Sequence, residues 1–247
     1  MTTAILSALP EEQAGLHELL QGKEIIRHAG RDFWCGQLSG QQVVLAQSGI
    51  GKVAAATTAT VLAERFGVQR IVFTGVAGGL AAQVRVGDVV VGSAYLQHDM
   101  DASPIFPKYE APGYQRSRFT ADAHLLAIVL EAAYAVDTWT TGQFGLKNGS
   151  KPVIHQGLII SGDRFVSTTT ESAALQAALP DALCVEMEGA AVAQVCCDYA
   201  LPFVAVRSIS DRADDNAHQD FPQFLRTVAA PLSQALVCQL MALLPKR

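Results

Sequence analysis

Carboxylates occur at three places where a predicted strand gives way to polar residues. Glu12 lies shortly after an N-terminal strand, Glu186 and Glu188 frame the end of a late strand, and Asp211 follows another. Positioned carboxyl groups can act as general acids or bases. They can also stabilise a helix start or cap a turn. The residues alone leave both a catalytic and a structural interpretation open.

Two glycine-rich segments could bring their backbone close to a ligand. Residues 49–54 follow a strand, open a helix and satisfy the G-x-G-x-x-A pattern of dinucleotide-binding turns. That pattern also needs an acidic residue roughly 20 positions further on, but the next strand ends Phe73-Thr74-Gly75. A tight turn explains this segment better than a nicotinamide site. Residues 74–80 carry three glycines, which indicates positive φ angles or close backbone approach to another group.

Strands and helices alternate along the chain, as in layered α/β proteins. Hydrophobic patterning predicts strands at 3–8, 33–38, 43–47, 70–74, 88–95, 153–161, 184–187 and 203–210. Helices are predicted after Pro10 and at 52–66, 121–134, 170–178, 189–199 and 221–244. We therefore expect one α/β domain spanning residues 1–247, with a largely parallel sheet made mixed by an early hairpin. Residues 98–119 and 137–152 are expected to be irregular excursions from it.

Composition excludes several classes of function. Half of the 247 residues are hydrophobic, so a sizeable core is expected, yet no apolar run is long enough to span a bilayer. A net charge of −5 without a basic run makes nucleic acid and anionic membranes poor partners. The start of the chain lacks a signal-peptide pattern, which favours a cytoplasmic location. The five cysteines lack zinc-site spacing and are expected to be reduced, and no metal site is predicted.

Six short motifs occur in a characteristic order. They are Ser48-Gly49-Ile50-Gly51-Lys52, residues 74–80, Val86-Gly87-Asp88, Ser161-Gly162-Asp163, Val185-Glu186-Met187-Glu188 and Ser210-Asp211. Together they resemble the 5′-methylthioadenosine/S-adenosylhomocysteine nucleosidases of the nucleoside phosphorylase and nucleosidase superfamily. The resemblance covers nearly the whole chain. It implies a three-layer αβα sandwich and an enzyme that releases adenine from 5′-thio-substituted adenosines without a cofactor.

The segment Pro10-Glu11-Glu12 favours hydrolysis over phosphorolysis. A phosphorylase must hold a phosphate dianion beside the anomeric carbon, and phosphorylases resembling this chain use glycine and arginine on the early loops. Carboxylates there would repel phosphate but suit the activation of water. The predicted substrate is therefore a small purine nucleoside, and the predicted nucleophile is water.

The resemblance assigns catalytic roles to three acids. Glu12 resembles the general base for the attacking water, and Asp211, supported by Ser210, resembles the general acid that protonates adenine N7. Glu188 resembles the carboxylate that accepts hydrogen bonds from the ribose hydroxyls. An oxocarbenium-like ribosyl cation would form between them, as in other glycoside hydrolyses, and the anionic Glu188 would stabilise it.

The same resemblance implies a set of binding residues. Met187 and Arg207 would lie at the ribose, while Phe165 would stack on the purine and the Val166 backbone would read its amino edge. Substrate contacts are also expected from Ile50, Val76, Ala77, Gly78 and Glu186. The segment 102–112, with Phe106, resembles the part that family members send across a dimer interface, which predicts a homodimer.

Some features depart from the family pattern. Val76 replaces a small hydroxyl residue, and the segment around Phe106 does not clearly reproduce the 5′ pocket. The excursion 137–152 is also longer than in compact members. The substrate could therefore be methylthioadenosine, S-adenosylhomocysteine, 5′-deoxyadenosine or aminodeoxyfutalosine. A phosphate-dependent purine nucleoside phosphorylase, a non-catalytic nucleoside-binding domain of this fold, and a dinucleotide-dependent oxidoreductase are the alternative functions.

Overall fold

The computed structural model describes residues 1–136, 152–217, 221 and 224–245, and the excursion expected at 137–152 falls almost wholly outside them. Its strands are β1 (Thr3–Ser7), β2 (Gln21–His28), β3 (Arg31–Leu38), β4 (Gln41–Gln47), β5 (Arg70–Gly79), β6 (Val89–Gln97), β7 (Arg118–Thr120), β8 (Ile154–Ser161), β9 (Ala182–Glu186) and β10 (Phe203–Asp211). The helices are α1 (Lys52–Glu64), α2 (Ala123–Ala135), α3 (Thr169–Ala178), α4 (Gly189–Asp198) and α6 (Ala230–Leu243). Shorter turns are η1 (Pro10–Gln13), η2 (Leu16–Glu18) and the π-helical η4 (Leu225–Ala229).

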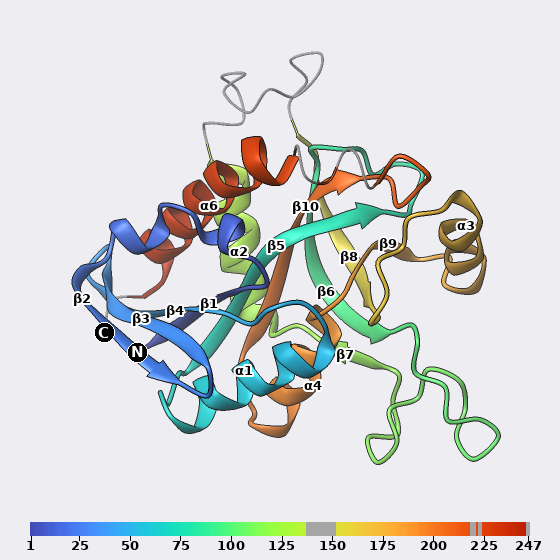
Figure 1. Cartoon of the computed structure of the whole chain (residues 1–247), viewed down its shortest axis with the longest axis horizontal. Helices are drawn as coiled ribbons and strands as arrows, with labels where there is room; N and C mark the ends of the chain where they lie inside the picture. The colour runs from blue at the N-terminus through green and yellow to red at the C-terminus, as the bar shows by residue number, and fades with distance from the viewer. Residues whose placement is uncertain (137–151, 218–220, 222–223, 246–247) are drawn as a thin grey trace.

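A mixed sheet separates two groups of helices, which gives the expected α/β layering (Figure 1). Alternate residues of β1 face opposite sides: Ala4 and Leu6 pack in the core that includes α1 and α4, whereas Ile5 packs in the core that includes α2 and α6. Both faces of the central strands are therefore buried, which explains their continuous apolar sequences.

Pairing in the sheet is less parallel than the sequence predicts. Among the described strands, five pairs are parallel and five are antiparallel. The antiparallel pairs include the early hairpin and also β10 with β6 and β5 with β9. The mixed character is confirmed, and the additional antiparallel pairs lie outside the early hairpin.

Strand β5 runs beyond its predicted end at residue 74 and continues through the glycine-rich segment to Gly79. Its end pairs with two strands at once, because Gly78 and Gly79 face β9 while residues 75–78 face β10. The pairings β5–β10–β6–β8–β9–β5 thereby close into a ring. In this glycine-rich part, β5 lies close to the backbone and side chains of its neighbours, which favours residues without a Cβ.

The N-terminal region differs from its predicted structure in two ways. The helix expected after Pro10 is instead two short turns, η1 and η2, because Gly15 between them adopts a φ of +83°. Strand β2 was not predicted, since most of its residues are exposed and it therefore lacks an alternating apolar pattern.

Within the described residues, no helix is both long and apolar enough to cross a bilayer.

Asp88 of the Val86-Gly87-Asp88 motif joins the starts of β6 and β8. Its buried carboxylate accepts hydrogen bonds from Val153 N (2.9 Å), Arg85 N (2.9 Å) and His155 Nε2 (2.9 Å). The motif thus has a structural role and lies at the end of the strands opposite to their carboxyl ends.

We predict that Asp88→Ala lowers the free energy of unfolding by about 3 kcal/mol, because it leaves buried donors without an acceptor. Urea denaturation measures the change. Asp32→Ala is the control, since Asp32 pairs with Arg27 on the exposed surface and its loss should leave the denaturation midpoint unaltered. Equal midpoints for the Asp88 variant and the unmodified chain would contradict the assignment.

Candidate active site

A cavity of about 310 Å³ opens where β1, β5, β9 and β10 end. Twelve of the residues proposed from the sequence line it: Glu12, Ile50, Val76, Ala77, Gly78, Phe165, Val166, Glu186, Met187, Glu188, Ser210 and Asp211. Residues separated by up to 199 positions thus converge on one space, because strand ends gather at one edge of an α/β sheet. The volume is in the range that small-molecule sites occupy.

Glu12 is fixed by backbone amides from two elements. Its Oε2 accepts hydrogen bonds from Ala8 N (2.8 Å) and Leu9 N (2.8 Å), and its Oε1 accepts one from Val76 N (3.1 Å). The first two amides follow β1, and the third belongs to β5. The turn η1 therefore holds this carboxylate directly against β5.

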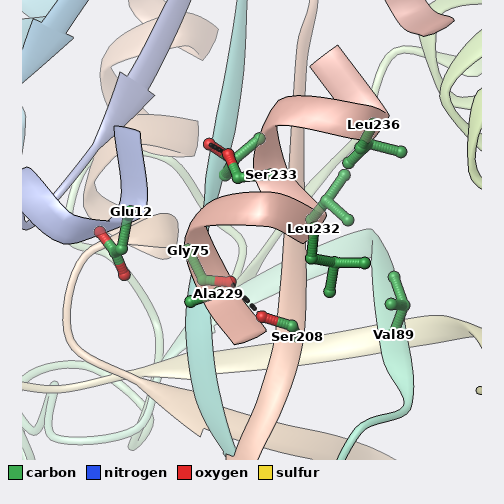
Figure 2. Close-up of a pocket in the computed structure, with 10 residues that line it drawn as sticks. Glu12, Gly75, Val89, Ser208, Ala229, Leu232, Ser233 and Leu236 are labelled. Atoms are coloured by element: carbon green, nitrogen blue, oxygen red, sulfur yellow. Dashed lines mark hydrogen bonds between the residues drawn. The ribbon is translucent and has the colours of Figure 1, made fainter. Parts of the chain in front are cut away.

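Burial raises the pKa of Glu12 above its ordinary value near 4.5, although the hydrogen bond from Leu9 N and the charge of Arg207 act in the opposite direction. Figure 2 shows the side of Glu12 that faces α6, where a second space of only about 20 Å³ lies among Leu232, Leu236 and neighbouring residues. That space is too small for a nucleoside. On this side, Glu12 therefore faces mainly apolar side chains. These side chains keep water from the carboxylate, which disfavours its charged form and raises its pKa.

Asp211 occupies the end of β10 beside Gly78. Its Oδ2 accepts a hydrogen bond from Ser210 Oγ (2.7 Å), and its Oδ1 accepts one from Ala213 N (2.8 Å). The turn-capping interpretation of Asp211 is therefore correct for one oxygen, while the side chain also lines the cavity. Local capping and a position in the site occur together.

The two acids of the Glu186-Met187-Glu188 motif differ in their surroundings. Glu186 accepts hydrogen bonds from the amide of Gly189 (2.8 Å) at the start of α4, from Ser161 Oγ, and from Arg207 Nη2 (2.7 Å). Glu188 instead accepts one from Gly51 N (2.8 Å) at the start of α1. Burial, and then the neighbouring Glu186, raise the pKa of Glu188 to about 8.

Arg207 lies beneath the cavity rather than on its surface. Its guanidinium donates to Glu186 Oε2 (2.7 Å) and to the carbonyl of Phe73 (2.9 Å), and its Cζ lies 4.2 Å from the centre of the Phe73 ring. Burial opposes its charge, but Glu186 and Glu12 keep the pKa of Arg207 above its usual value. A permanent positive charge therefore stands behind the buried acids.

Glycines of β5 make room for the acids. A Cβ at Gly75 would lie 2.8 Å from Glu12 Oε1, and a Cβ at Gly78 would lie 2.9 Å from Asp211 Oδ1. Neither glycine has a positive φ. Of the two explanations that the sequence allowed, close approach is the correct one.

Aromatic and aliphatic side chains form the outer part of the cavity. Phe165 and Phe221 meet edge to face with ring centres 5.7 Å apart, and Ile50 contributes a side chain that is 57% exposed. Phe106 is not among the lining residues; it belongs to the segment between β6 and β7 that extends away from the body of the molecule (Figure 1).

Sequence reasoning missed five lining residues: Ala8, Leu9, Arg164, Val185 and Phe221. Arg164 and Val185 adjoin assigned residues, so their neighbours could have identified them. Phe221 follows an irregular polar stretch and carried no local signal. No group of three or more potential metal ligands occurs in the part of the chain that the structure describes.

Comparison with known proteins agrees with this geometry. The family model of the phosphorylase superfamily matches residues 2–242. A 5′-methylthioadenosine/S-adenosylhomocysteine nucleosidase of Staphylococcus saprophyticus is 37% identical over 230 residues, which cover 93% of this chain and 95% of the relative.

Two solved structures of such nucleosidases superimpose closely. The Colwellia psychrerythraea protein, in complex with adenine, is 36% identical with a TM-score of 0.89 and covers 99% of this chain and 96% of its own. The Neisseria meningitidis protein, in complex with methylthio-immucillin-A, is 33% identical with a TM-score of 0.88, and the match covers 98% of each chain. With the sequence relative and the family model, these similarities show that the chain belongs to the phosphorylase superfamily and, within it, to the 5′-methylthioadenosine/S-adenosylhomocysteine nucleosidases.

Proposed function

We propose that this protein hydrolyses the N-glycosidic bond of 5′-methylthioadenosine and S-adenosylhomocysteine and releases adenine. One observation supports the proposal most directly: Glu12 and Asp211 line the same cavity and contact β5 two residues apart, at Val76 and Gly78. A strand rises about 3.3 Å per residue, so these points are about 7 Å apart. That separation accommodates a ribosyl carbon with water on one side and a purine on the other.

The bond changes follow from the two acids. Glu12 takes a proton from water as the water oxygen bonds to the anomeric carbon, and Asp211 delivers a proton to adenine N7 as the carbon–nitrogen bond breaks. The electron pair of that bond leaves with a neutral adenine. The raised pKa of Glu12 makes it a stronger base than an ordinary glutamate once it is ionised.

In this scheme, Glu188 and Met187 contact the ribose. Glu188 has one oxygen bonded to Gly51 N, and its other oxygen is available to accept from ribose hydroxyls. In its ionised form, which is populated in the free protein as the pH rises toward 8, Glu188 also stabilises the developing ribosyl cation. Glu186 is better described as a positioning residue, because its oxygens bind Arg207, Ser161 and the start of α4.

The outer cavity suits a purine with an apolar 5′ substituent. Phe165 offers a ring face for stacking, and its neighbour Val166 can pair its backbone with the amino edge. Leu9, Ile50 and Phe221 supply an apolar wall for a thioether. The adenine and methylthio-immucillin-A complexes of the related enzymes support this class of substrate.

Charge favours water over phosphate as the acceptor. Glu12, Glu188 and Asp211 line the cavity, whereas Arg207 is paired with Glu186. A phosphate dianion would therefore meet carboxylates at short range. Val76 preserves the backbone hydrogen bond to Glu12, and its side chain packs with Phe224 and Leu225. The replacement thus leaves the base in position.

A cytoplasmic homodimer is the form we propose for the active protein. All five cysteines are free, which suits a reducing compartment. Ile50, Val53 and Ile105 expose 57%, 78% and 82% of their surface. Large exposed aliphatic residues, one lining the cavity and another on the segment that extends from the body, favour coverage by a second copy.

We predict adenine release from 5′-methylthioadenosine in phosphate-free buffer, measured by chromatography. Glu12→Gln and Asp211→Asn should each lower kcat by about 10²- to 10⁴-fold, because each removes a proton transfer. Glu11→Gln is the matched control, since that adjacent carboxylate is exposed and should be dispensable. Strict phosphate dependence with a 5-methylthioribose-1-phosphate product would show a phosphorylase instead, and tight binding without turnover would show a non-catalytic domain.

The stability of the folded chain should depend on pH through Glu188. Glu188 titrates near pH 8 in the folded chain but near 4.5 when unfolded, so its stabilising protonation is present below pH 4.5 and lost as the pH rises toward 8. Glu188→Gln keeps an acceptor for Gly51 N and removes the charge. Its melting temperature should exceed that of the unmodified protein by about 2–6 °C more at pH 8 than at pH 5. A pH-independent difference, such as we expect for Glu11→Gln, would contradict this.

A third prediction addresses assembly. Light scattering after gel filtration should give twice the chain mass of 26.2 kDa, and Ile105→Asp should reduce that mass by placing a charge in the interface. Lys108→Asp, a charge change on the same segment, provides a comparison for non-specific effects. A monomer for the unmodified chain would refute the proposed homodimer.

A further inference from the structure

We infer that Lys52, Asp99 and Asp163 form a positioning ring that aims Glu188 at the ribose. Nothing in the reaction scheme uses these residues, and none of them lines the cavity. The inference depends on the proposed function, since it gives them a role in binding the same substrate.

The three residues close a ring of hydrogen bonds. Lys52 Nζ donates to Asp99 Oδ1 (2.6 Å), Asp163 N donates to Asp99 Oδ2 (2.9 Å), and Lys52 N donates to Asp163 Oδ1 (2.7 Å). They come from the start of α1, the segment after β6 and the segment after β8. The ring therefore ties together three chain segments that are distant in sequence.

Gly51 connects the ring to the active site. Its N–H donates to Glu188 Oε1 (2.8 Å), and the next amide, of Lys52, is the one that Asp163 holds. A Cβ on Gly51 would lie 3.1 Å from Asp163 Oδ1, so the aspartate also packs closely against this residue. Contacts of Asp163 with the Cα side of Gly51 and with the following amide keep Gly51 in the position from which its N–H reaches Glu188. It contributes charge-assisted hydrogen bonding to Glu188.

The position of Asp163 is in turn fixed by contacts of the preceding residue, Gly162. Gly162 N donates to the carbonyl of Glu186 (3.1 Å), and the ring of His98 packs directly on Gly162, where a Cβ would collide with it. The turn 161–163 is therefore fixed to the same strand end that presents Glu186. Both acids of the Glu186-Met187-Glu188 motif contact this turn. Ser161 Oγ donates to the carboxylate of Glu186, and Asp163 acts on Glu188 through Gly51.

Opening the ring should change the orientation of Glu188. Repulsion from Glu186 already opposes the charge of Glu188. Without a fixed Gly51 N–H, the carboxylate loses the hydrogen bond that holds it and can turn away from the sugar. Displacement of a positioned group by about 1 Å is enough to reduce rates about a hundredfold.

The test is a double-mutant cycle between Asp163 and Glu188. Asp163→Ala should weaken binding of methylthio-immucillin-A by about 10- to 100-fold in the unmodified protein, measured by calorimetry, and reduce kcat/KM similarly. In the Glu188→Ala background the same change should weaken binding less than about threefold, because that variant has no side-chain acceptor for Gly51 N to orient. Asp163→Asn keeps an acceptor oxygen for Lys52 N and should retain most of the affinity.

Other variants separate this role from a general loss of structure. Asp99→Ala opens the ring at another point and should reproduce the effect even if Asp163→Ala fails to fold. Asp181→Ala removes an ion pair of the same length, with Arg118 (2.6 Å), at a more exposed position and should leave both affinity and kcat/KM unaltered. Equal losses in both backgrounds, or full affinity in Asp163→Ala and Asp99→Ala, would overturn the inference. Absence of adenine release from the unmodified protein would instead refute the proposed function.

Discussion

Burial of several carboxylates around one guanidinium is the constraint on which this site depends. Arg207 is removed from water, pairs with Glu186 and lies within the electrostatic reach of Glu12 and Glu188. A single buried cation cannot neutralise all of these acids, so each of them needs donors from the backbone. The amides come from the segment after β1, from β5 and from the starts of α1 and α4. The fold therefore supplies hydrogen-bond donors at the places where the chemistry requires negative charge.

Those donors also give each acid a different environment. Glu12 is held by three amides and faces mainly apolar side chains toward α6, whereas Asp211 receives a serine hydroxyl and a turn amide. Glu186 is saturated by partners, and Glu188 keeps one oxygen directed to the cavity side. Four side chains of similar chemistry thus become suited to different tasks through local structure alone.

Much of this arrangement was predictable where local patterns carry the information. Helices α1 and α3 and strand β10 lie within about two residues of their predicted ranges, because their apolar spacing and caps are local. Strand β2 and the turns η1 and η2 were missed, since an exposed strand has no alternation and Gly15 interrupts the helix. The acids were identified from their positions at strand ends. Phe221 and Asp99 were not, because their neighbours in space lie far away in sequence.

In the proposed mechanism, strand β5 positions both the base, Glu12, and the acid, Asp211. The amide of Val76 binds one acid and the missing Cβ of Gly78 makes room for the other. Their separation is therefore set by two peptide units of a strand that β10 pairs along this whole stretch and β9 pairs at its end. This separation is therefore fixed by the backbone geometry of the strand. Substitutions that alter substrate preference can then occur at Leu9, Ile50 and Phe165, which line the outer part of the cavity. Substitutions there leave the separation between the proposed base and the proposed acid unaltered.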